Sequence, residues 1–364
     1  MVDALLYEPI PYRSAIEQGC THVLVLRSYP DGRRMPQGYL GLFERLVAPK
    51  CLDPFPRVKD YMISLKHSER YSEDILQLNE GVAPALASDG QAVELPALAS
   101  GVIDLGSLAA WLEAHKETLQ RAPGGTLLAL QAANNETGVV QPVADAVALA
   151  ATYGVLVHVD AVQAVGRLPT DFAASKSSFL AISGHKLGGP KGIGALVVRS
   201  GAPLPPRVIG GGQERGMRAG TENVAAIAGF GAAAAAAAGE IGYFAALGGL
   251  RDRIEAGVIQ ASPGAVVIAQ DSERLPNTTC LALPGRTAET LVAAFDLTGV
   301  AVSAGAACSS GKVQASPVLA AMGLSRDIAR GAIRISIGPA TTVEDIDAFV
   351  AAWVRITRRA AQAA

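Results

Sequence analysis

The sequence is short of cysteine and has no excess of charge of either sign. Its four cysteines, Cys20, Cys51, Cys280 and Cys308, form no CxxC pair and have no histidine at the spacing of a metal ligand. This pattern indicates neither a disulfide framework nor a metal site, and it favours the cytoplasm. The 31 Lys and Arg residues against 33 Asp and Glu residues leave a net charge of -2. No overall field therefore favours nucleic acid or an anionic membrane surface as a partner.

Targeting and membrane-spanning segments are not evident either. Asp3 and Glu8 interrupt the start of the chain, where a signal peptide would need a basic start and an apolar run. The longest uncharged stretch, residues 223–239, is mostly alanine and glycine. It is too short and too weakly apolar for a membrane span of about 20 residues. The alanine run within it, residues 232–238, predicts a structural helix.

The composition of the chain changes near residue 80, where a segment rich in tyrosine and charged clusters gives way to one rich in Ala, Gly and Val. We predict three units, residues 1–82, 83–245 and 246–364. Apolar runs predict strands at residues 21–28, 125–132, 155–159, 179–182, 194–198, 265–269 and 278–283. Helical patterns lie between several of them, at residues 143–153 and 287–297. Alternation of strands and helices predicts an α/β fold.

Two of the predicted strands end in residues that could carry chemistry. One ends at Asp160, with Gln163 three residues later; the acid alone would equally suit a helix N-cap. Another ends in a glycine-rich turn that contains Lys186, which could form a Schiff base or could be a solvated loop lysine. Ser183 and His185 flank the same turn. Together these five residues supply the groups that bind pyridoxal phosphate: an amine, an acid for the pyridine nitrogen, a donor for the ring oxygen, and phosphate ligands.

Six stretches in this order resemble the cysteine desulfurases of the class V aminotransferase family. They are residues 134–138 (NNETG), 158–163 (HVDAVQ), 183–186 (SGHK), 218–223 (RAGTEN), 303–311 (SAGAACSSG) and 333–336 (IRIS). The resemblance covers about residues 85–360. It implies the type-I fold of pyridoxal phosphate enzymes, with a mixed-sheet cofactor domain and a smaller α/β carboxyl-terminal domain.

The resemblance also implies a cofactor, pyridoxal 5'-phosphate, and a role for each ligand. Lys186 would bind the cofactor covalently and move the substrate's α-proton. Asp160 would pair with the pyridine nitrogen, Gln163 with the ring hydroxyl, and Ser183 and His185 with the phosphate. Because the family builds its site from two chains, a homodimer is implied.

The remaining implied roles concern the partner subunit and the substrate, L-cysteine. Thr221 would reach the phosphate bound by the other subunit. Asn135 would lie beside cofactor and substrate, and Arg334 would clamp the substrate carboxylate through two hydrogen bonds. Cys308 would take the sulfur as a persulfide and leave L-alanine. Alone, it would equally suit a small buried hydrophobe. A sulfur acceptor or iron–sulfur scaffold protein would be the further partner.

The chain also departs from the family at its amino-terminal end. It lacks the expected phosphate loop, and Gly81 stands where a histidine would stack on the pyridine ring, so we expect weakened cofactor binding. Residues 1–78 resemble instead the carboxyl-terminal part of a patatin-like phospholipase, without a GxSxG nucleophile, so we expect no acyl hydrolysis. Three alternatives stay open: an active desulfurase, a relative acting on selenocysteine or as an aminotransferase, and an inactive relic with a binding role.

Overall fold

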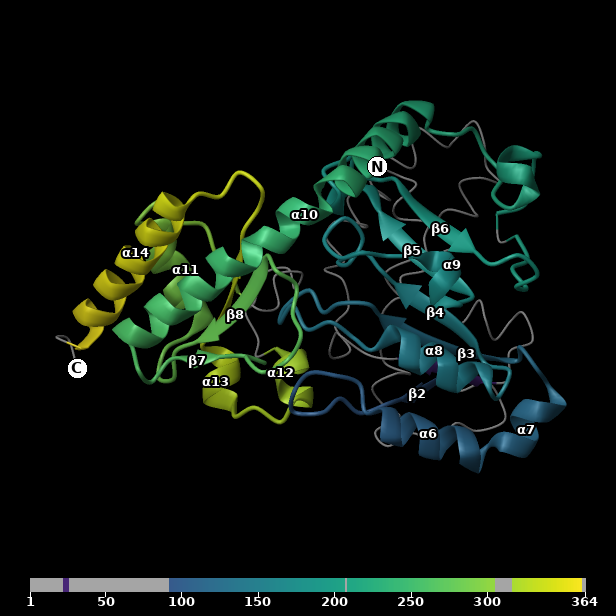
Figure 1. Ribbon diagram of the computed structural model, residues 1–364, viewed down its shortest axis with the longest axis horizontal. Helices are drawn as coiled ribbons and strands as arrows, with labels where there is room; N and C mark the ends of the chain where they lie inside the picture. The colour runs from purple at the N-terminus through teal and green to yellow at the C-terminus, as the bar shows by residue number, and fades with distance from the viewer. Residues whose placement is uncertain (1–21, 26–91, 207, 305–315, 362–364) are drawn as a thin grey trace, which may run out of the picture.

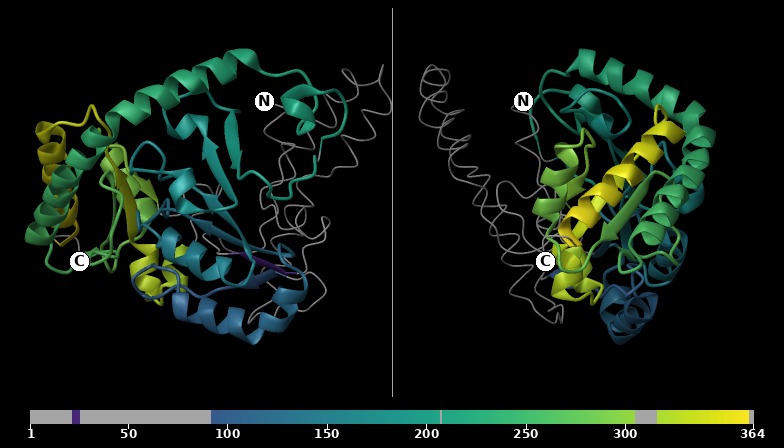
Figure 2. Two further views of the ribbon diagram at one scale, coloured as in Figure 1. Left: turned by 45° about the vertical axis from the view of Figure 1, so that its right-hand side comes forward. Right: turned by 90° about the vertical axis from the view of Figure 1, so that its left-hand side faces the viewer.

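The computed structural model describes residues 22–25, 92–206, 208–304 and 316–361, and everything below concerns these residues (Figure 1). They form two α/β units, each built around its own sheet. One long helix, α10 (Val224–Ala261), runs along both units and connects them (Figures 1 and 2). The fold class predicted from the alternating strands and helices is confirmed.

The larger unit contains a mixed sheet in the order β2-β1-β3-β4-β5-β6. Its strands are β1 (His22–Val25), β2 (Ala92–Glu94), β3 (Thr126–Gln131), β4 (Leu156–Asp160), β5 (Phe179–Ser183) and β6 (Gly194–Val198). Neighbouring strands are parallel except β5 and β6, which are antiparallel. The strands expected from the apolar runs are therefore present. Strand β1 comes from the predicted first unit but lies between β2 and β3, while the three-unit division itself stays a prediction.

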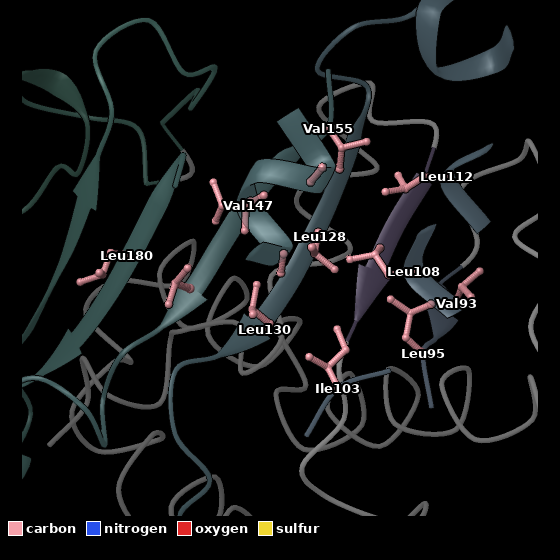
Figure 3. Packing of buried hydrophobic residues seen from close by; sticks show 14 of the residues in the cluster. Val93, Leu95, Ile103, Leu108, Leu112, Leu128, Leu130, Val147, Val155 and Leu180 are labelled. Carbon is pink, nitrogen blue, oxygen red and sulfur yellow. The ribbon is translucent and has the colours of Figure 1, made fainter. Parts of the chain in front are cut away.

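Helices pack on this sheet and bury its apolar side chains. They are α6 (Leu105–Ala114), α7 (Lys116–Arg121), α8 (Val143–Ala151) and α9 (Phe172–Ser175). Leu128 and Leu130 of β3 lie in one cluster with Leu108 and Leu112 of α6 and Val147 of α8 (Figure 3). Because β3, β4 and β5 are parallel, their carboxyl ends meet at one edge, where α/β proteins place ligands.

The smaller unit has an antiparallel sheet in the order β7-β8-β10-β9. Its elements are β7 (Val266–Val267), β8 (Thr278–Ala282), α11 (Ala288–Asp296), β9 (Ser303–Ala304), α12 (Pro317–Ala321), α13 (Arg326–Arg330), β10 (Ala332–Ser336) and α14 (Val343–Ala361). Stacked Phe295 and Phe349 pack with Trp353 in its core. The register of β10 sets Arg334 opposite Cys280 of β8 and Ser303 of β9.

The predicted alanine helix is confirmed as part of α10, which extends well beyond the uncharged stretch. By length and composition alone α10 could cross a membrane, but it contacts α14, β8 and the 3-10 turn η3 (Gly184–Lys186). A Cβ added at Gly189 would lie 3.2 Å from the Cβ of Ala233, and one at Gly166 would lie 3.0 Å from that of Ala237. Larger residues in the alanine run would therefore push α10 away from the turn that carries Lys186.

Candidate active site

Lys186 lies at the end of η3, directly after β5. Backbone hydrogen bonds close this turn, because Gly184 N donates to the carbonyl of Ile193 at 2.9 Å and Gly189 N donates to the carbonyl of Gly184 at 2.9 Å. Gly188 has φ 84°, a conformation that favours glycine. The turn holds the side chain of Lys186 half-buried at the edge of the sheet.

Ser183 and His185 bracket the same turn and contact each other. The Oγ of Ser183 lies 2.7 Å from Nδ1 of His185. Burial, together with the positive charges of Lys186 and Lys191, lowers the pKa of His185, so its imidazole is neutral near pH 7. A hydroxyl, an imidazole and an ammonium group in one turn form a donor set suited to a phosphate.

Asp160 ends β4, between Gln131 of β3 and Ala181 of β5 in register. Its side chain is exposed, and its Oδ1 accepts a hydrogen bond of 2.9 Å from Val162 N. Within the described residues Oδ2 accepts no hydrogen bond and is available to a donor at this edge. The acid is therefore placed at the carboxyl edge of the sheet, as the sequence predicts.

Arg167 connects Gln163 to the lysine turn through hydrogen bonds. The sequence motifs imply no role for this residue. Nη1 of Arg167 donates to the carbonyl oxygen of Gln163 at 2.6 Å and to its side-chain Oε1 at 3.1 Å. Nη2 donates to the carbonyl of Lys186 at 3.2 Å. Burial and the neighbouring charge of Arg334 lower the pKa of Arg167. The only sequence signal was its position four residues after Gln163.

Arg334 reaches this edge from the smaller unit. Its Nη1 donates to the carbonyl oxygen of Asn135 at 3.0 Å, and its buried Nε has no hydrogen-bond partner among the described residues. Asn134 shapes the turn that presents Asn135, because its Oδ1 accepts from the backbone N of Glu136 at 2.8 Å and of Thr137 at 2.9 Å. The structure thus brings Asn135 and Arg334 together.

Glu136, which belongs to the motif at residues 134–138, is fully buried. Its Oε2 accepts a hydrogen bond of 2.6 Å from the hydroxyl of Ser316, which also caps α12. Its Oε1 has no hydrogen-bond partner in the described part of the chain. Burial raises the pKa of Glu136 from 4.5 to about 7, against the opposing effects of Ser316 and Arg334. The carboxyl therefore ties the turn at Asn135 to the start of α12 and titrates near neutrality.

Replacing Glu136 with glutamine should change how stability depends on pH. The pKa of Glu136 is raised in the folded protein. Between about pH 4.5 and 7 the folded protein therefore keeps a proton that the unfolded chain has released. The free energy of unfolding falls as the pH rises through this window. The neutral Glu136→Gln variant should exceed wild type by about 3 kcal/mol above pH 8 and match it near pH 4.

Urea unfolding at several pH values measures this difference. Glu117→Gln, on an exposed side chain of α7, is the control and should follow wild type within about 0.5 kcal/mol. A Glu136→Gln effect that is the same at every pH would contradict the assigned titration.

Other predicted residues are not brought to this edge by the described contacts. Thr221 is exposed just before α10 and makes no hydrogen bond to the site residues within the described ranges. Cys308 and Gly81 lie outside the described residues, as do the patatin-like residues 1–78 apart from β1. Strand β9 and Ser316 are the nearest described parts on either side of the Cys308 stretch. The roles of Thr221 and Cys308, the effect of Gly81 and the patatin-like resemblance stay predictions.

The donor set fits pyridoxal phosphate. The structure offers a half-buried lysine, an acid with a free oxygen at the sheet edge, a fixed amide, and a hydroxyl–imidazole pair beside positive charge. No group of three or more His, Cys, Asp or Glu side chains that could hold a metal occurs among the described residues. The residues at the edge of β3, β4 and β5 are therefore compatible with the groups of pyridoxal phosphate.

Comparisons with known proteins identify the family of the chain. Residues 95–349 match the family model "Aminotransferase class-V". The chain is 44% identical over 236 residues to a cysteine desulfurase of Cereibacter sphaeroides, covering 65% of this chain and 60% of that protein. It is 37% identical over 272 residues to an IscS-like cysteine desulfurase of Mycobacterium tuberculosis, covering 74% of this chain and 67% of that protein.

A solved structure gives the same result for the fold. The X-ray structure of a NifS-like protein from Rickettsia africae matches with a TM-score of 0.64 and 35% identity, covering 74% of this chain and 70% of that chain. The present chain spans about 60% of the length of the first of these curated relatives. Since the family match covers well over half of the sequence and the fold agrees with it, the chain belongs to the class-V aminotransferase family.

Proposed function

We propose that this protein is a pyridoxal phosphate-dependent cysteine desulfurase, which converts L-cysteine to L-alanine and keeps the sulfur as a persulfide on Cys308. One observation carries the proposal: Arg167 joins the lysine turn to Gln163, and Arg334 contacts Asn135, which follows β3 at the carboxyl edge of the same sheet. The similarity to cysteine desulfurases supports the same reaction.

Each residue of this edge would have a defined task. The bound cofactor supplies an electron-withdrawing ring that acidifies the substrate's α-carbon. Arg334 binds the substrate carboxylate, Lys186 holds the cofactor and then carries the proton at its amine, and Asp160 accepts the hydrogen bond of the ring nitrogen. The Cys308 thiolate attacks the substrate sulfur: an S–S bond forms, the carbon–sulfur bond breaks, and the carbon takes a proton to give alanine.

The direct test is the stoichiometry of the reaction. Purified protein supplied with pyridoxal phosphate, L-cysteine and a thiol reductant should release alanine and sulfide in equal amounts. L-Selenocysteine and other amino acids, assayed in parallel, distinguish this activity from the alternatives within the family. If no amino acid is turned over while the cofactor is bound, the protein is not a desulfurase and a binding role is the better account.

Replacing Arg334 with lysine should weaken substrate binding specifically. A lysine keeps the charge but cannot donate two parallel hydrogen bonds to a carboxylate. We expect KM for L-cysteine to rise about 10- to 100-fold, with a smaller effect on kcat, in steady-state assays. Arg330→Lys, on the exposed end of α13, should leave both constants unchanged. Equal KM values for Arg334→Lys and wild type would rule out this role.

The remaining parts of the proposal concern assembly and setting. A homodimer is supported by large exposed hydrophobic side chains on either side of Thr221 in the chain: Val208, Ile209, Met217, Val224 and Ile227. Burying them between two chains would place Thr221 at the interface, as the family resemblance requires. The sulfur would pass to an acceptor or iron–sulfur scaffold protein. A cytoplasmic setting is supported by the free thiol of Cys280 among the described residues and by the absence of a CxxC pair from the sequence.

A further inference from the structure

Arg167 contacts two of the proposed cofactor ligands at the same time. It donates to the carbonyl and to the Oε1 of Gln163, and to the carbonyl of Lys186. All three acceptors are neutral oxygens. The guanidinium of Arg167 is half-buried, and the nearby guanidinium of Arg334 helps to lower its pKa. Holding a cation at such a place without a charged partner costs free energy. General packing does not explain why a cation stands here.

The contacts do explain the orientation of Gln163. A guanidinium group can only donate, so the side-chain atom of Gln163 that faces Arg167 must be the oxygen. The NH2 group of Gln163 is then left to donate elsewhere. A glutamine whose amide were free to rotate would present either end to a ligand. Arg167 therefore makes Gln163 a donor of fixed direction.

We infer that Arg167 is a positioning residue that fixes Gln163 as a hydrogen-bond donor for the cofactor's ring oxygen and holds the Lys186 turn beside it. The inference rests on the proposed function, because it assigns a role toward the same cofactor. Arginine is suited to this role since its planar fork reaches three acceptors, while lysine ends in a single nitrogen.

The test is a double-mutant cycle read on the bound cofactor. Wild type, Gln163→Ala, Arg167→Met and the double variant are titrated with pyridoxal phosphate, and the absorbance band is followed with pH. Arg167→Met and Gln163→Ala should each weaken cofactor binding about 10-fold and move the band's pH midpoint in the same direction. The double variant should bind the cofactor no worse than Arg167→Met alone, because removing Arg167 already abolishes the fixed donor that Gln163 provides.

A purely structural role would give a different pattern. Losses that multiply in the double variant, or an Arg167→Met protein with an unchanged pH midpoint, would overturn the inference while leaving the proposed function intact. Absence of the band in wild type would overturn the proposed function, and the donor role with it. Arg121→Met, whose side chain is 80% exposed on α7, is the matched control and should behave as wild type.

Arg167→Lys keeps the test open if Arg167→Met does not fold. Lysine can retain some of the hydrogen bonds, so we expect affinity and pH midpoint between those of wild type and Gln163→Ala. Circular dichroism of each apoprotein reports folding separately. If Arg167→Lys has the cofactor affinity and pH midpoint of wild type while Gln163→Ala changes both strongly, then orienting Gln163 does not require the planar guanidinium of Arg167, and the inference is wrong.

Discussion

Replacing Lys186 with alanine is expected to abolish both the cofactor absorbance band and the turnover of L-cysteine. The structure holds Lys186 in a closed turn that also carries the Ser183–His185 pair, with no second lysine in the 3-10 turn. Removing the amine removes the covalent attachment and the proton carrier together. Activity should fall by about 10⁴-fold or more.

The measurement is an absorbance spectrum with pyridoxal phosphate, followed by an alanine assay. Lys191→Ala, on an exposed residue of the same glycine-rich segment, is the matched control and should keep the band. A band of normal intensity in Lys186→Ala that shifts on addition of L-cysteine would show that another amine holds the cofactor. The assignment of the site to this turn would then be wrong.

Replacing Cys308 with alanine should separate cofactor binding from sulfur transfer. The variant is expected to keep the absorbance band, because no proposed cofactor ligand is changed, and to lose persulfide formation completely. Turnover to alanine should fall at least about 10³-fold, since no thiolate accepts the sulfur. Mass spectrometry of the protein after reaction with L-cysteine detects the extra sulfur atom.

Cys280 offers the matched control for this experiment. Its side chain is fully buried in β8, and burial raises the pKa of its thiol to about 12. It is therefore a protonated, inaccessible thiol at neutral pH, and Cys280→Ala should still form the persulfide. If the Cys308→Ala variant still forms a persulfide and the Cys280→Ala variant does not, then Cys280 carries the sulfur and Cys308 does not.

Local sequence patterns determined most of the elements of this fold. Apolar runs marked β3 to β6 and β8. In the central strands β3 and β8 most of these side chains are buried, whereas β6 is an antiparallel edge strand that is only partly buried. The polar residues that follow these runs, Asp160, Ser183 and Lys186, were found because strand ends carry ligands in α/β proteins. Membership of the class-V aminotransferase family followed from short motifs whose order along the chain is itself informative.

Only the tertiary structure decided which of these residues contact each other. Arg334 meets Asn135 across 199 residues of chain, and Ser316 meets Glu136 across 180. Such pairs depend on the register of β10 and on the docking of α10 against both units, neither of which a local pattern encodes. The role proposed for Arg167 also needed the fold, because the carbonyl of Lys186 joins the two local acceptors of Gln163 only when the lysine turn packs on the Gln163 turn. Periodicity and motif order specify elements and residue types, whereas contacts between distant residues are set by how the packed layers fit together.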